Sequence, residues 1–171
     1  MERQPSTFDG VGAGLLAGAS VIALFLVYDA LRMNPVATPM EFARVLFGVE
    51  GPALGVTDSG SGATRAATIA TAVFRLIAYT GMHFLVFAGL GALAARLFAR
   101  FRIPPNAFTG ALYGLTACTA VLFAAFMIVW PPVTGPSVVG ILIANACAGA
   151  IIGIQLRGGQ RKPDSLKSVP F

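Results

Sequence analysis

Three polar side chains recur at helical spacing inside a long apolar stretch, and they are the first candidates for chemistry. Arg75, Tyr79 and His83 stand at positions i, i+4 and i+8, which puts them on one face of a helix. Ionisable groups inside a membrane are unfavourable and often functional. His83, the only histidine of the chain, therefore predicts either an axial ligand to haem or a hydrogen-bond partner to a quinone, with Tyr79 and Arg75 completing a polar track.

A structural interpretation of the same residues needs no cofactor. His83 can instead form a hydrogen bond to a neighbouring helix. Its partner would be one of four residues: Tyr113, Thr116, Thr119 or Asn145. A haem iron held by two histidines would need the second from another subunit. Arg75 can extend to the membrane interface or pair with Asp29. The sequence therefore leaves open both a cofactor site and a purely structural role for these residues.

Catalytic signatures are missing from the sequence. It contains no nucleophile elbow, no HExxH and no P-loop. Cys118 and Cys147 form no CxxC pair and have no metal-ligand spacing. We therefore expect no enzyme, no catalytic residue, no metal site and no cofactor, with haem or quinone at His83 as the alternative.

The composition is that of an integral membrane protein. Of 171 residues, 56% are hydrophobic and 11% are charged, and the mean hydropathy is +0.79. Soluble domains carry about 25% charged residues. The net charge of +5 is not a nucleic-acid footprint, because the sequence has no basic patch with interleaved aromatic residues.

Four apolar stretches are long enough to cross a membrane as helices. They cover roughly residues 10–32, 64–101, 107–130 and 137–157. The second would be about 55 Å long at 1.5 Å per residue, so it must tilt, kink or project from the bilayer.

A short amphipathic helix is predicted between the first two spans, at about residues 39–49. Thr38, Pro39 and Glu41 fit a capping box with threonine as the N-cap. The helix is too short to span, so we expect it at the membrane interface. The predicted fold is an all-α membrane protein: one four-transmembrane-helix bundle over residues 1–157, this interfacial helix, and a basic flexible cytoplasmic tail over 158–171.

Small residues mark the predicted helix-packing faces. Glycine at every fourth position lets two helix backbones approach closely, and in lipid this is a main source of association. Seven glycines have this spacing: Gly10, Gly14, Gly18, Gly110, Gly114, Gly149 and Gly153. Asn145 would add an interhelical hydrogen bond. These faces suit self-association or contact with other membrane-protein subunits.

The charge distribution predicts an orientation. Eight of the twelve basic residues lie in the two termini and around the connection between the second and third spans. The positive-inside rule puts both termini in the cytoplasm, as a multi-pass protein of a cell inner membrane. Trp130 at the outer end of the third span suits an interfacial anchor.

The stretches FDGVGAGLLAGASVIALFLVYDAL, TPMEFARVLFG and AYTGMHFLVFAGLGALAA resemble a group of small bacterial four-helix inner-membrane proteins. The resemblance covers about the first hundred residues. It implies a fold and a membrane location, without a reaction.

The function expected from the sequence is that of a non-catalytic accessory or structural subunit of a larger membrane complex, respiratory or photosynthetic. Its partners would be membrane lipids and other subunits or a second copy of itself. The alternatives are a small haem- or quinone-binding electron-transfer protein built around His83, and a small transporter or channel lined by Arg75, His83 and Asn145.

Overall fold

A computed structural model describes residues 4–34, 36–47, 62–128 and 138–160. Within these residues the fold is entirely helical. The described chain runs through α1 (Thr7–Leu31), α2 (Ala37–Phe47), α3 (Gly62–Phe101), α4 (Ala107–Tyr113), a π-helical turn η1 (Gly114–Cys118), α5 (Thr119–Ile128) and α6 (Val138–Gln160). Trp130 and the turn after it lie outside the described residues.

Four helical stretches of the described chain are long and apolar enough to cross a membrane: residues 7–31, 66–101, 107–125 and 138–159. Large apolar side chains cover much of the molecular surface; Leu31, for example, is 81% exposed and Leu85 is 73% exposed. Such a surface is stable against lipid and not against water. The architecture is that of a multi-pass membrane protein.

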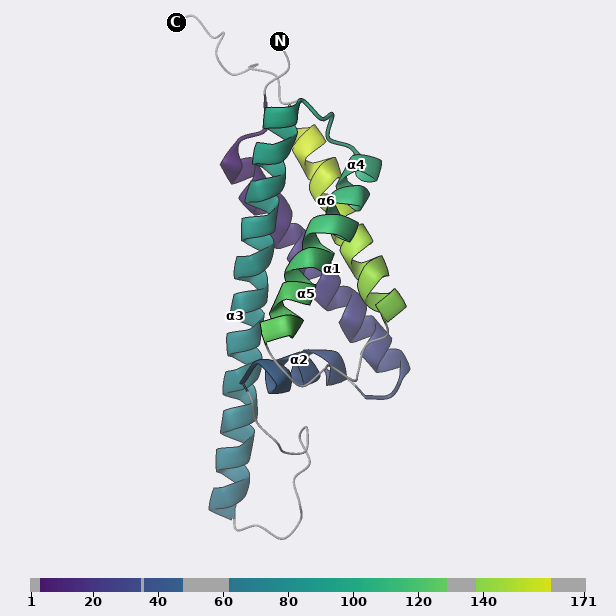
Figure 1. Ribbon diagram of the computed structural model, residues 1–171. Helices are drawn as coiled ribbons and strands as arrows, with labels where there is room; N and C mark the ends of the chain where they lie inside the picture. The colour runs from purple at the N-terminus through teal and green to yellow at the C-terminus, as the bar shows by residue number, and fades with distance from the viewer. Residues whose placement is uncertain (1–3, 35, 48–61, 129–137, 161–171) are drawn as a thin grey trace, which may run out of the picture.

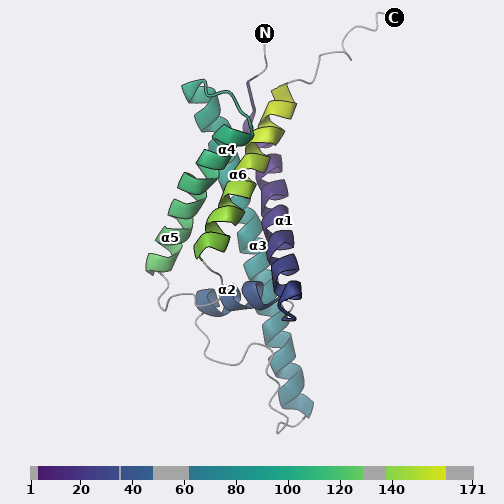
Figure 2. The ribbon, with the colours of Figure 1, turned by 90° about the vertical axis from the view of Figure 1, so that its right-hand side faces the viewer.

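The helices pack in a definite order. α1 packs against α3 on one side and α6 on the other, and α6 packs against α4 and η1. Both views show the start of α1, the end of α3, the start of α4 and the end of α6 at one end of the molecule (Figures 1 and 2). We call this the basic end, because Arg96, Arg100, Arg102 and Arg157 belong to the segments that meet there.

α3 is longer than its neighbours and projects beyond them at the opposite end (Figures 1 and 2). Whether α3 tilts in or projects from the bilayer, as its length requires, stays a prediction. α2 lies crosswise at this end, packed against α3 and α1.

α1 begins three residues earlier than the sequence analysis expected, at Thr7. The reason is a capping box formed by Ser6 and Asp9. The Asp9 amide donates to Ser6 Oγ at 3.1 Å, and the Ser6 amide donates to Asp9 Oδ2 at 2.9 Å. These bonds satisfy backbone groups that the first helical turn leaves free.

The predicted N-cap at Thr38 is wrong, because α2 begins at Ala37 and Thr38 lies inside its first turn. Asp29, at the end of α1, supplies the acceptor instead. Its Oδ2 accepts from the Thr38 amide and its Oδ1 from the Thr38 hydroxyl, both at 2.7 Å. A carboxylate near a helix N-terminus is also favoured by the helix dipole. α2 is therefore anchored to α1 through one buried residue.

The third span contains an irregularity that the sequence analysis missed. Residues Gly114–Cys118 form a π-helical turn, where the chain is locally wider than an α-helix. The Thr116 hydroxyl donates to the Leu112 carbonyl at 2.9 Å and to the Tyr113 carbonyl at 3.2 Å. Such back-bonding competes with regular helical hydrogen bonds.

At its C-terminal end α6 runs to Gln160, so residues 158–160 are helical where the sequence analysis expected the tail to begin. The rest of that predicted tail lies outside the described residues.

Candidate functional site

His83 is tied to α1 by a hydrogen bond. Its Nε2 lies 3.1 Å from the Gly18 carbonyl oxygen. Since a carbonyl only accepts, Nε2 carries a proton. In the neutral form of the ring, Nδ1 is then an acceptor. The observed acceptor is a backbone atom, and none of the four side-chain partners considered in the sequence analysis fills this role.

Aromatic rings surround the imidazole. Its centroid lies 4.7 Å from that of Phe87, 5.9 Å from Phe84 and 5.9 Å from Tyr79. Tyr79 in turn stacks on Phe42 of α2, with centroids 5.9 Å apart and planes parallel to within 1°. The ring series Phe42, Tyr79, His83 and Phe87 therefore joins the crosswise helix α2 to the interior of the protein.

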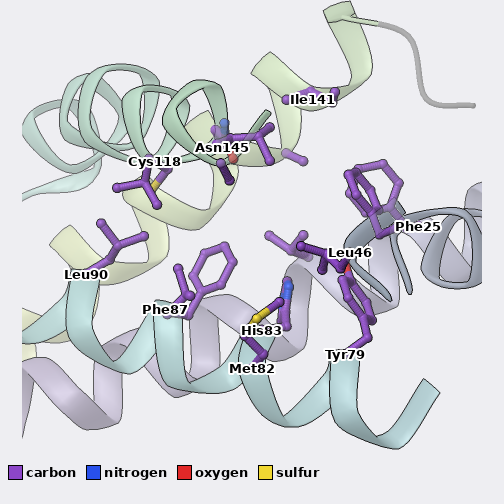
Figure 3. Close-up of a pocket in the computed structure, with 17 residues that line it drawn as sticks. Phe25, Leu46, Tyr79, Met82, His83, Phe87, Leu90, Cys118, Ile141 and Asn145 are labelled. Carbon is purple, nitrogen blue, oxygen red and sulfur yellow. The ribbon is translucent and has the colours of Figure 1, made fainter. Parts of the chain in front are cut away.

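These rings form part of the wall of a cavity of about 170 Å³ (Figure 3). The cavity lies between α1, α2, α3, the η1–α5 run and α6. No Asp, Glu, Lys or Arg is among its described lining residues, which are Val21, Phe25, Phe42, Leu46, Tyr79, Met82, His83, Val86, Phe87, Leu90, Cys118, Val121, Leu122, Ala125, Ile141, Ala144 and Asn145.

Asn145 faces His83 across this cavity (Figure 3). It is 7% exposed, and its Nδ2 donates to Thr119 Oγ1 at 3.1 Å. This bond holds α6 to the start of α5. The amide oxygen, Oδ1, takes no hydrogen bond from any described residue.

Three polar atoms belong to residues that line the cavity: His83 Nδ1, Asn145 Oδ1 and the Tyr79 hydroxyl oxygen. None has a hydrogen-bond partner among the described residues. No fully buried side-chain nitrogen or oxygen in the described chain lacks a partner. The three atoms must therefore be accessible, and their residues line the cavity.

Only part of the polar stripe predicted on α3 lies at the cavity. Tyr79 and His83 line the cavity, whereas Arg75 is not among its lining residues. Arg32 lies with Cζ 4.9 Å from the centroid of the Tyr28 ring, and the Asp29 carboxylate binds Thr38 as described above.

The glycines predicted to pack helices meet other helices of the same chain. Gly10 and Gly14 of α1 contact the backbone of Gly91 and Phe87 in α3. Gly18 faces the Phe87 side chain, where an added Cβ would lie 3.1 Å from the Phe87 Cβ. These contacts bring α1 close enough to α3 for His83 to reach Gly18.

A second set of close contacts joins the third and fourth spans. Gly110 and Gly114 lie against Gly149, Gly153 and the Asn145 carbonyl of α6, with no room for a Cβ at any of the four glycines. In both sets the glycines associate helices within the chain. The structure thus brings His83, Tyr79 and Asn145 to one cavity by two glycine-mediated crossings.

Several cavity residues were not predicted as site residues, among them Phe42, Phe87 and Cys118. Phe87 continues the i+4 series of Tyr79 and His83, so that spacing carried a signal. Nothing in the sequence pattern indicated the approach of Phe42 or the π-helical turn that ends at Cys118.

Comparisons with known protein families, with characterised proteins and with solved structures found no match. The resemblance noted in the sequence analysis therefore stays a prediction, and the functional interpretation rests on the geometry.

Proposed function

We propose that this chain is a non-catalytic membrane protein that binds a small, uncharged, lipid-soluble molecule between His83 and Asn145. The observation that carries the proposal is an apolar cavity with accessible hydrogen-bonding atoms on opposite walls. Ligand sites are typically apolar, with a few polar groups that orient the ligand.

The size of the cavity selects the size of the ligand. A cavity of roughly 150 Å³ holds one benzene molecule, and this cavity measures about 170 Å³. A single ring fits, and the stacked aromatic wall favours a flat one. A haem macrocycle is too large for this volume, and the imidazole Nε2 is already bound to Gly18. These points favour the quinone alternative over haem.

The exposed polar atoms select the ligand's hydrogen-bonding character. His83 Nδ1 in the Nε2–H tautomer and Asn145 Oδ1 both accept. A ring with hydroxyl donors at opposite positions, such as a hydroquinone with a lipid tail, satisfies both. Its oxidised form offers only carbonyl acceptors to these atoms, so we propose that the reduced form binds more tightly.

The orientation we propose puts the basic end in the cytoplasm and the protein in a bacterial inner membrane. Support comes from Arg96, Arg100, Arg102 and Arg157, which belong to segments meeting at this end, together with the positive-inside rule. The crosswise α2 then lies at the opposite membrane interface, and the four spans form a bundle.

A role as an accessory subunit is a second candidate, favoured by the projecting end of α3. Its apolar side chains are exposed: 50% for Val73, 69% for Phe74 and 66% for Ile77. If α2 lies at the interface beside Tyr79, Phe74 is about 7.5 Å farther along α3, on the outer side of that interface. Exposed apolar surface in water indicates contact with another protein. Because the described packing glycines meet helices of their own chain, such a contact would use this surface.

The test of ligand binding is to purify the protein from its natural host in polymer-bounded native discs and identify the extracted small molecules by mass spectrometry. We expect a neutral single-ring lipid at near one copy per chain, absent from discs of an Ala125→Phe variant that fills the cavity. Equal extracts from both proteins would contradict the proposal.

Native-size separation of the same discs tests the subunit role. We expect the protein to comigrate with a larger complex. Loss of comigration in Phe74→Ser would support a contact through the exposed α3 surface.

A further inference from the structure

A second cavity lies at the basic end, far along the helices from His83. It measures about 520 Å³ and is lined by residues from the segment before α1, the end of α3, the connection from α3 to α4, and α6. Unlike the first cavity, it is bordered by charged side chains.

Two arginines contribute that charge. Arg102 follows α3 directly, and Arg157 comes from the last turns of α6. Both are exposed, and no Asp or Glu is among the described lining residues. Asp9, which lies near Gly159 of α6, is not a lining residue and accepts hydrogen bonds from Ser6. The described lining of the cavity is therefore positively charged.

The backbone at Arg102 has an uncommon conformation. Arg102 has φ 53°, in the left-handed region that glycine usually occupies after a helix. Two backbone bonds maintain the turn: the Arg102 amide donates to the Ala99 carbonyl at 3.4 Å, and the Ile103 amide to the Phe98 carbonyl at 3.0 Å. A non-glycine residue at such a position is a strained choice, and strain of this kind concentrates at functional sites.

Of the two polar side chains beside the arginines, Asn106 is occupied by other bonds, whereas Gln4 adds one amide donor to the cavity wall. Asn106 Oδ1 accepts from the Phe108 and Thr109 amides, and its Nδ2 donates to the Pro104 carbonyl. Asn106 thus serves as the cap of α4. Arginine presents a planar set of N–H donors that matches the oxygens of a phosphate.

Apolar side chains adjoin this charged cavity: Ile103 lines it, and Phe101 precedes Arg102 in the chain. Phe101 is 63% exposed and Ile103 is 37% exposed. A ligand that meets both features carries a phosphate and an acyl chain. We propose that Arg102 and Arg157 bind the phosphate of an anionic phospholipid headgroup at this end. Basic sites between spans on the cytoplasmic side bind such lipids in other membrane proteins.

The test is native mass spectrometry of the full chain, titrated with phosphatidylglycerol, phosphatidylcholine or inorganic phosphate. We expect phosphatidylglycerol to be retained, with Arg102→Gly and Arg157→Gln each weakening its binding roughly tenfold, the loss expected for one charged hydrogen-bonding partner. Arg96→Gln and Arg100→Gln, which change exposed arginines outside the cavity lining, should change it less than twofold.

Arg102→Gly separates binding from folding. Glycine suits the left-handed position, so this variant should melt at or above the wild-type temperature while its lipid affinity falls. Equal phosphatidylglycerol binding by wild type and both cavity variants would overturn the proposal, as would an equal loss in the two controls. Displacement of the lipid by millimolar inorganic phosphate would also overturn it, in favour of a free-phosphate site.

Discussion

His83 Nε2 lies 3.1 Å from the Gly18 carbonyl oxygen, so the single imidazole of the chain bridges α3 and α1. The bond assigns a proton to Nε2 and, in the neutral form of the ring, leaves Nδ1 as an acceptor. It also orients the ring between Tyr79 and Phe87. A residue that in sequence resembles a metal ligand thus donates a hydrogen bond to a backbone carbonyl beside an apolar cavity.

Replacing His83 by Phe should weaken ligand binding more than folding. The substitution keeps a ring against Phe87 but removes both the bond to Gly18 and the Nδ1 acceptor. An interhelical hydrogen bond in a membrane contributes about 0.6 kcal/mol to the free energy of unfolding, whereas loss of a ligand contact should lower affinity roughly tenfold. Calorimetric titration with a short-chain hydroquinone measures the second effect. Leu85→Phe, at a 73% exposed position of the same helix, is the control and should bind normally.

Asn145 and Thr119 allow the two roles of one hydrogen bond to be separated. Asn145→Leu removes the bond to Thr119 and the accessible Oδ1, so both stability and hydroquinone affinity should fall. Thr119→Val removes only the bond and leaves the Asn145 amide in the cavity wall. We expect Thr119→Val to retain affinity within about threefold, which is less than about 0.7 kcal/mol. A tenfold loss of affinity in Thr119→Val would contradict this separation, because it would show that binding depends on the hydrogen bond between Asn145 and Thr119.

The contact of α1 with α3 should be sensitive to a single methyl group at Gly14. An added Cβ there would overlap the Phe87 carbonyl, and overpacking of this kind destabilises by about 1–3 kcal/mol. Gly12→Ala is the matched control, because no atom lies within 4 Å of its added Cβ, and it should stabilise the helix by about 0.5–1 kcal/mol. Unfolding by denaturing detergent, followed by circular dichroism, compares the two. Equal stabilities would be inconsistent with the close crossing.

Asp29 should control the attachment of α2. Asp29→Ala removes both acceptors of Thr38, and loss of a helix cap costs about 1–2 kcal/mol. Amide hydrogen exchange within Ala37–Phe47 should accelerate, with little change in α6. Arg32→Ala, which removes only the side chain over Tyr28, should leave the exchange of α2 unchanged. Slow exchange of α2 in Asp29→Ala would contradict this role for Asp29, because packing on α3 would then be sufficient to hold α2 in place.

The sequence predicted the apolar helices well, because length and hydropathy alone determine which segments can cross a membrane. It also indicated Tyr79 and His83 as neighbours on one helix face. It did not predict Gly18 as the partner of His83, since every helical residue has a carbonyl and none is distinguished by sequence. The cap on α2 was misassigned for a related reason: Asp29 is nine positions from Thr38, beyond the local spacing that defines a capping box.

The cavity itself could not be predicted, because it arises from the relative placement of five helical segments. Ala125 and Asn145, for example, share it only because η1 widens the third span and α6 crosses that span at Gly149. The locations of Gly110 and Gly114 suggested a close contact, yet their partners could have been in this chain or another.

The most direct test of the account compares two substitutions of adjacent alanines in α5. Ala125 lines the cavity, whereas Ala124 is exposed and does not. Calorimetric titration of the reconstituted protein with a short-chain hydroquinone should show saturable binding for the wild type and Ala124→Phe. Ala125→Phe fills the cavity and should weaken binding at least tenfold, which is about 1.4 kcal/mol. Equal affinity in the two variants, or no saturable binding by the wild type, would contradict a ligand site between His83 and Asn145.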